Sequence, residues 1–179
     1  SDVYKRQGYE EEAFAWRAWL LRAVAGNPDK LQILYGARGE RRLPEFEADW
    51  LSGYAGSRPV RIGNAAAEQL QLDVYGEVAD VMHQAHRAGL PPDTEEWALN
   101  RAVVEAVTNR WAEPDRGLWE VRGDCRHFVH SKVLAWVALD RGIAAIERFG
   151  LDGPVDRWRA LRAQIHDDVC TKGYDPKRE

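Results

Sequence analysis

Residues 110–128 read Arg-Trp-Ala-Glu-Pro-Asp-Arg-Gly-Leu-Trp-Glu-Val-Arg-Gly-Asp-Cys-Arg-His-Phe and form a loop between two helical patterns. This loop is one of two long connections that decide the fold. Glu120 within it is flanked by Leu118, Trp119 and Val121, and burial of this apolar cluster would desolvate the carboxyl group and favour its protonated form. A protonated carboxyl group can serve as a general acid at neutral pH. In the alternative interpretation, the apolar residues plug a helix end and Glu120 is solvated.

Five amphipathic patterns surround this loop and predict five helices. The first has acidic residues in its first turn and basic residues later, which matches the helix dipole. Gly26 is placed to cap the end of this helix, and Asn64 is placed to cap the start of the second. Asp93 with Glu96 has the spacing of a capping box that begins the third. The predicted helices cover about residues 9–26, 64–88, 93–111, 127–149 and 155–169.

The connections between these helices are alternately long and short. Residues 31–35 form a short strand or extended segment, and residues 36–63 form a long loop rich in Gly, Pro, Arg and aromatic residues. Helices joined by short connections run antiparallel, so both long loops emerge at the same end. The second and fourth helices have the broadest apolar surfaces, as expected of an inner ring. The sequence therefore predicts an all-α fold in which helical hairpins form a toroid with a site at one mouth.

Composition limits the classes of protein to which the chain can belong. The 179 residues are 45% hydrophobic, enough for one domain with a core. The net charge is −4, and basic and acidic residues are interleaved, which gives no electrostatic footprint for nucleic acid. No apolar run is long enough to span a bilayer, and no export signal begins the chain, so we expect a cytoplasmic protein that does not bind a membrane.

Cysteine and histidine residues give no sign of a metal or a cofactor. Cys125 and Cys170 are far apart and lack ligand spacing, which predicts free thiols in a reducing compartment. Two histidine pairs have a spacing of three residues, His83 with His86 and His127 with His130, but neither has a third ligand nearby. No cofactor is expected.

The two ends of the chain do not read as the ends of a domain. Residues 1–7 resemble the translation of a sequencing adaptor, and we exclude them from the expected domain, which is residues 8–179. Residues 173–176 read as a turn that leads into a further segment. We therefore expect an interior part of a longer protein.

Four motifs in order resemble bacterial members of glycoside hydrolase family 15, which includes glucoamylases, glucodextranases and a trehalase branch. They lie at residues 53–66, 69–77, 117–123 and 127–136, and the likeness extends from residue 8 to the end. The resemblance implies an (α/α)6 toroid of which about five helices are present. It also implies inverting hydrolysis of α-glucosidic bonds, either in trehalose or at the non-reducing ends of α-glucans, so the expected partner is an α-glucoside.

The resemblance also assigns roles to residues. The glutamate after Trp in the Leu-Trp-Glu motif is the general acid of the family, which corresponds to Glu120. Arg61 corresponds best to a sugar-contacting arginine, and the guanidinium group of Arg58 suits the same task. Trp119 would offer an apolar face to a pyranose ring. Structural alternatives remain open, because Trp119 could fill a core and both arginines could bind nearby acids.

Two departures from the glucoamylase pattern favour the trehalase branch. Ile62 stands where glucoamylases commonly have Asp after the sugar-contacting arginine, and Val121 stands where they have a second acid.

The resemblance does not supply the second catalytic group. An inverting enzyme also needs a base about 6.5–9.5 Å from the acid. The resemblance places that base after residue 179, so the chain alone is expected to be inactive. The alternatives to an enzyme are a non-catalytic carbohydrate-binding or regulatory (α/α)6 domain and a helical interaction scaffold.

Overall fold

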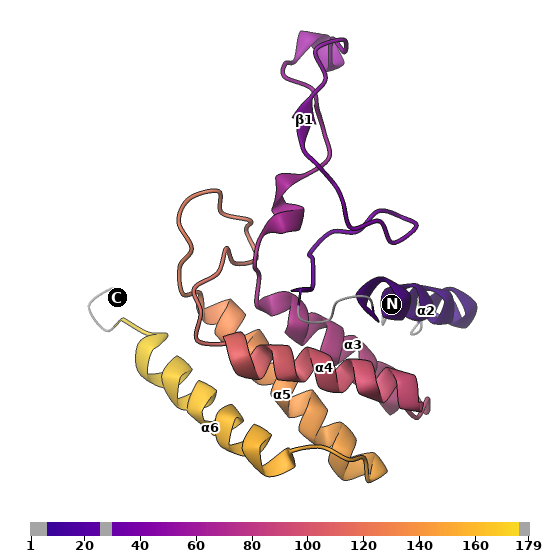
Figure 1. The fold of residues 1–179 in the computed structure, drawn as a ribbon, viewed down its shortest axis with the longest axis vertical. Helices are drawn as coiled ribbons and strands as arrows, with labels where there is room; N and C mark the ends of the chain where they lie inside the picture. Colours follow the sequence, from indigo (N-terminus) through magenta and orange to yellow (C-terminus); the bar gives the residue numbers. More distant parts are fainter. Residues whose placement is uncertain (1–6, 26–29, 176–179) are drawn as a thin grey trace.

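A computed structural model describes residues 7–25 and 30–175, and within them the chain is helical with little sheet (Figure 1). This confirms the all-α prediction. The cap expected at Gly26, and most of the segment 1–7, lie outside the described residues. The α-helices are α2 (Glu10–Ala25), α3 (Asp73–Arg87), α4 (Thr94–Arg110), α5 (Val129–Phe149) and α6 (Val155–Lys172).

Helices α3 and α5 form the centre of the packing and share the largest interhelical contact. Gly76 makes this close crossing possible, because a Cβ atom at this position would lie 2.3 Å from the carbonyl oxygen of Leu134. Tyr75 of α3 and Leu139 of α5 are fully buried beside the crossing. The two helices expected to have the broadest apolar surfaces are therefore the ones that pack against each other.

The other helices cover this central pair. Helix α6 packs on α5 and buries Trp158, whose Nε1 donates to Glu105 of α4 at 2.9 Å. Helix α4 contacts α2, α3 and α5. Trp97 of α4 donates from Nε1 to the carbonyl oxygen of Asp152 at 3.0 Å, which fixes the short connection between α5 and α6. This arrangement of central and covering helices is consistent with part of an (α/α)6 ring.

Both long connections lie on one side of the helices, and the short connections 88–93 and 150–154 lie on the other (Figure 1). The longer one projects as a hairpin in which β1 (Phe46–Glu47) pairs antiparallel with β2 (Arg61–Ile62). The 3₁₀-helix η2 (Tyr54–Gly56) lies at its tip. No helix among the described residues is long and apolar enough to cross a membrane.

The prediction of one continuous helix from residue 64 to residue 88 is wrong at its start. Asn64 does act as a cap, since its side chain accepts from the backbone N–H of Ala66 at 2.9 Å. The element it caps is the 3₁₀-helix η3 (Ala65–Glu68), and α3 begins only at Asp73. Between them, Leu70 and Leu72 use backbone groups to bind the loop 111–128, and these groups are not available to a helix.

The capping box expected at α4 is formed by half. The Asp93 carboxylate accepts from the backbone N–H of Glu96 at 2.8 Å, as predicted. The buried carboxylate of Glu96 does not complete the box. It pairs instead with Arg17 of α2 and lies 3.3 Å from Nε2 of His86 in α3. Glu96 therefore connects three helices.

Candidate active site

The base of the loop 111–128 is fixed to the start of α3. Asp115 and Arg126 exchange two backbone hydrogen bonds, of 2.9 and 2.8 Å, which close the loop. The buried Asp115 carboxylate accepts from the backbone N–H of Leu72 at 2.9 Å, and the backbone N–H of Arg116 donates to the carbonyl oxygen of Leu70 at 3.0 Å. Four hydrogen bonds thus set the position from which the loop extends.

Glu120 lies in a tight turn at the far part of this loop. Its backbone N–H donates to the carbonyl oxygen of Gly117 at 3.1 Å, and its φ is +52°. Left-handed backbone is uncommon for a residue with a side chain, costs about 1–2 kcal/mol and is found preferentially at functional sites. Gly117 itself has φ +65°, and a Cβ atom there would lie 2.7 Å from the ring of Phe128.

The apolar cluster expected to bury Glu120 is not formed. Leu118 is 52% exposed and Trp119 is 84% exposed, while Glu120 and Val121 are partly exposed. The expectation is wrong because the loop carries these residues away from the helices, where no described segment covers them. For the same reason Trp119 neither fills the core nor plugs a helix end, and its ring is accessible to a ligand.

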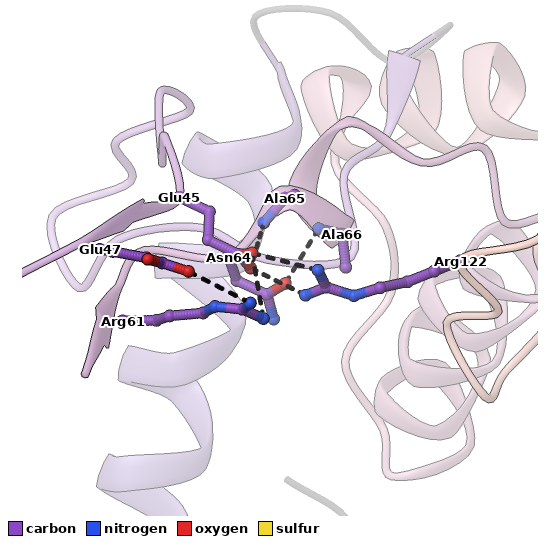
Figure 2. A network of polar contacts seen from close by, with 7 residues as sticks. All are labelled: Glu45, Glu47, Arg61, Asn64, Ala65, Ala66 and Arg122. Atoms are coloured by element: carbon purple, nitrogen blue, oxygen red, sulfur yellow. Dashed lines mark hydrogen bonds and ion pairs between the residues drawn. The ribbon is translucent and has the colours of Figure 1, made fainter. Parts of the chain in front are cut away.

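A chain of ion pairs joins this loop to the projecting hairpin (Figure 2). The guanidinium group of Arg122 binds both carboxylate oxygens of Glu45, at 3.1 and 2.9 Å. Arg61 lies 3.9 Å from Glu45 and 3.5 Å from Glu47. The structure therefore brings Arg61 and the segment that carries Glu120 to the same end of the molecule, and it also shows that Arg61 binds nearby acids.

Arg58 takes no part in these ion pairs. It is exposed and lines a pocket on the hairpin together with Glu47, Leu51 and Val60. Its side chain makes no hydrogen bond or ion pair with another described residue. Of the four residues selected from the sequence, the structure thus links Arg61 through Glu45 and Arg122 to the loop that carries Glu120 and Trp119, and it leaves Arg58 further out on the hairpin.

Comparisons with known proteins identify the family of the chain. The sequence pattern of the family described as "Glycosyl hydrolases family 15" matches residues 3–179. The chain belongs to glycosyl hydrolase family 15.

Curated relatives carry the name trehalase. Trehalase of Mycobacterium tuberculosis (strain ATCC 25618 / H37Rv) is 41% identical over 175 residues, which are 95% of this chain and 25% of that protein. For trehalase of Mycolicibacterium smegmatis (strain ATCC 700084 / mc(2)155) the identity is 42%, with 95% and 26% covered. Trehalase of Thermoplasma acidophilum (strain ATCC 25905 / DSM 1728 / JCM 9062 / NBRC 15155 / AMRC-C165) is 34% identical, with 95% and 29% covered. The chain thus spans about a quarter of the length of these relatives, and no solved structure matches it.

A buried polar layer beneath the loop was not predicted from the sequence. Asp73 and Lys132, near the starts of α3 and α5, and Asp115, in the loop itself, are all at most 5% exposed. Burial raises the pKa of the Asp73 carboxyl group above its ordinary value, and burial lowers the pKa of the Lys132 ammonium group. Lys132 donates from Nζ to the carbonyl oxygens of Trp111 and Glu113. This family 15 chain therefore supports its loop on charged groups that lie inside the fold.

Of the two glutamines that precede Asp73, only Gln71 is buried. Gln71 is 4% exposed, and its amide donates to Oε1 of Gln69 at 3.2 Å. Gln69 itself is partly exposed and lines two surface pockets. Within the described residues, no group of three or more His, Cys, Asp and Glu side chains is placed to hold a metal ion. Cys125 and Cys170 are exposed free thiols.

Proposed function

We propose that the full-length protein hydrolyses trehalose with inversion of configuration and that Glu120 is its general acid. The observation that carries the proposal is the ion-pair chain from Arg122 through Glu45 to Arg61, which joins the Leu-Trp-Glu loop to the hairpin. The left-handed backbone of Glu120 supports the proposal, because strain of this kind is concentrated at functional positions. Family membership and relatives named trehalase favour trehalose over α-glucan ends.

Each selected residue has a role in the proposed reaction. Glu120 transfers its proton to the departing glycosidic oxygen, which makes the leaving glucose neutral. Trp119 packs against one face of the glucosyl ring, and Arg61 donates hydrogen bonds to its hydroxyl groups. Arg58 contacts the outer part of the substrate. The base that activates water comes from outside the 179 residues, and the family 15 domain includes residues 8–179.

The role of Glu120 is tested by Glu120→Gln in the full-length protein. Glutamine keeps the shape of the side chain and cannot supply the proton, so we expect kcat for trehalose to fall at least ~100-fold. Glu113→Gln is the matched control, because Glu113 is an exposed glutamate of the same loop that pairs with Arg110. Unchanged turnover in Glu120→Gln would refute the assignment.

The stereochemistry is tested by NMR of the first products. Trehalose contains two α-linked glucosyl units, so inversion at one anomeric carbon releases one β-glucose and one α-glucose. Retention would release two molecules of α-glucose. A β-anomer signal equal to the α signal, before mutarotation, is the expected result, and its absence would exclude inversion.

Purified residues 8–179 are expected to hydrolyse neither trehalose nor maltose. The proposed reaction needs two carboxyl groups, and these residues supply only the acid. Release of glucose would be measured at high protein concentration. Hydrolysis above that of a Glu120→Gln version of the same chain would show that the second carboxyl group lies within it.

A further inference from the structure

We propose that Glu45 and Arg122 are positioning residues. Their ion pair fixes the position of Glu120 relative to Arg61, and the Glu45 carboxylate offsets the effect of the Arg122 charge on Glu120. The inference rests on the proposed role of Glu120. It assigns a task to two residues that have no proposed contact with the substrate and that act through Glu120 and Arg61. Both lie in the network drawn in Figure 2.

Glu45 is the fixed member of the pair. Its side chain is only 17% exposed, and its Oε2 accepts from the backbone N–H of Ala65 at 3.2 Å, next to the Asn64 cap of η3. Arg122 is 63% exposed and reaches it from the other long connection, across 77 positions of sequence. A bidentate pair fixes the guanidinium plane as well as its distance. The hairpin therefore determines where the segment after Glu120 lies.

The same carboxylate governs the charge around the general acid. Arg122 is two positions after Glu120 and interacts electrostatically with both Glu120 and Glu45. The hydrogen bond from Arg122 lowers the pKa of Glu45, and the hydrogen bond to Glu45 raises the pKa of Arg122, so both groups are charged at neutral pH. The other charged groups of the network are Arg61 and Glu47 on the hairpin. Arg116 is a further cation on the loop and donates to the carbonyl oxygen of Val121 at 3.5 Å.

Removing one partner leaves the other uncompensated, and the two removals act on Glu120 with opposite signs. Without the Glu45 charge, Arg122 favours the ionised form of Glu120, so its proton is lost at lower pH. Without the Arg122 charge, the proton is retained to higher pH. Because the general acid must be protonated, kcat falls as pH rises through its pKa, and this descending limb reports the change.

The experiment measures kcat and KM for trehalose across pH in the full-length protein and its variants. Glu45→Gln should move the descending limb of kcat to lower pH by about half a unit, as expected for one charge at several ångströms in a partly solvated site. Arg122→Gln should move it to higher pH. The double variant should bring the limb back towards the parent, while kcat/KM stays about tenfold lower in all three because the register is lost.

Two further variants separate charge from position. Arg122→Lys keeps the charge without the bidentate fork, so its limb should stay near the parent while kcat/KM falls. Arg159→Gln is the matched control, because it breaks an exposed pair with Glu147, of 2.7 Å, between α5 and α6. It should change neither quantity.

Particular results would overturn the inference. If Glu45→Gln and Arg122→Gln, folded as judged by circular dichroism, move the limb in the same direction or leave it unchanged, the pair does not tune Glu120. If both variants also keep the kcat/KM of the parent, the pair does not position Glu120. These results leave the proposed function intact as long as Glu120→Gln is inactive, whereas an active Glu120→Gln removes the basis of both.

Discussion

Replacement of Gly76 by alanine tests the close crossing of α3 and α5. The added Cβ would lie 2.3 Å from the carbonyl oxygen of Leu134 and 2.7 Å from its Cδ1. The Cδ1 atom belongs to a side chain that can rotate. The carbonyl oxygen belongs to the backbone of α5 and can move away only if the two helices separate.

The expected loss of stability follows from two opposing effects. Alanine in place of glycine inside a helix gains about 1 kcal/mol of helix propensity. Forcing an additional carbon atom into a packed core costs about 1–3 kcal/mol, and an obstacle on the backbone places Gly76→Ala at the upper end of that range. The net destabilisation is therefore about 2 kcal/mol. For a chain of this length it corresponds to a fall in Tm of about 4–8 °C.

Thermal unfolding followed by circular dichroism measures this change in the 179-residue chain. Gly123→Ala is the control, since a Cβ atom at Gly123 would meet only a side-chain atom of Val121 at 3.8 Å. The control should melt with the parent. A Gly76→Ala chain that melts at or above the parent temperature would show that the crossing tolerates a methyl group and that helix propensity outweighs the contact.

Substitutions at two further positions probe the buried polar groups at the base of the loop, each by chemical denaturation. Asp73→Asn should stabilise the chain at neutral pH. Burial raises the pKa of Asp73 in the folded chain, so the stability of the parent falls as pH rises from the ordinary pKa of 3.8 through the raised pKa. The stability gained by the variant should therefore vanish below pH 3.8. A gain that persists in acid would contradict this. Asp115→Ala should cost about 1–3 kcal/mol, because the buried N–H of Leu72 loses its acceptor, and Asp115→Asn should cost less because it keeps an oxygen there. Equal losses in the two variants would refute the role of that hydrogen bond.

Local sequence predicts those elements whose ends are determined locally. Asp93 begins α4 as expected, because a side-chain cap needs only the next three residues. The end of α5 was also predicted, since Gly150 adopts the left-handed cap with φ +64°. The start of α3 was not, because Leu70 and Leu72 are bound by a loop more than forty positions later, as the 43-residue separation of Leu72 and Asp115 shows.

Some residues of the candidate site can also be predicted from local sequence, and others cannot. Glu120 and Arg61 were selected because each lies in a motif that can be read without knowing the fold. Glu45 and Arg122 were not selected, since they are 77 positions apart in the sequence and nothing near either of them indicates the contact of 2.9 Å that the fold creates. Asp115 was also missed. Nothing near it in the sequence indicates that its carboxylate would be buried and would bind the backbone at Leu72.

The strained turn at Glu120 explains why both of these distant contacts are needed. A residue with φ +52° would relax towards ordinary backbone if its loop were free, at a gain of about 1–2 kcal/mol. The loop is held on one side of the turn by Asp115, bonded to the start of α3, and on the other side by Arg122, bonded to Glu45. Relaxation of the turn would have to break one of these anchors. The backbone around Glu120 is therefore held by contacts with two segments far away in the sequence, while the turn itself supplies only the bend.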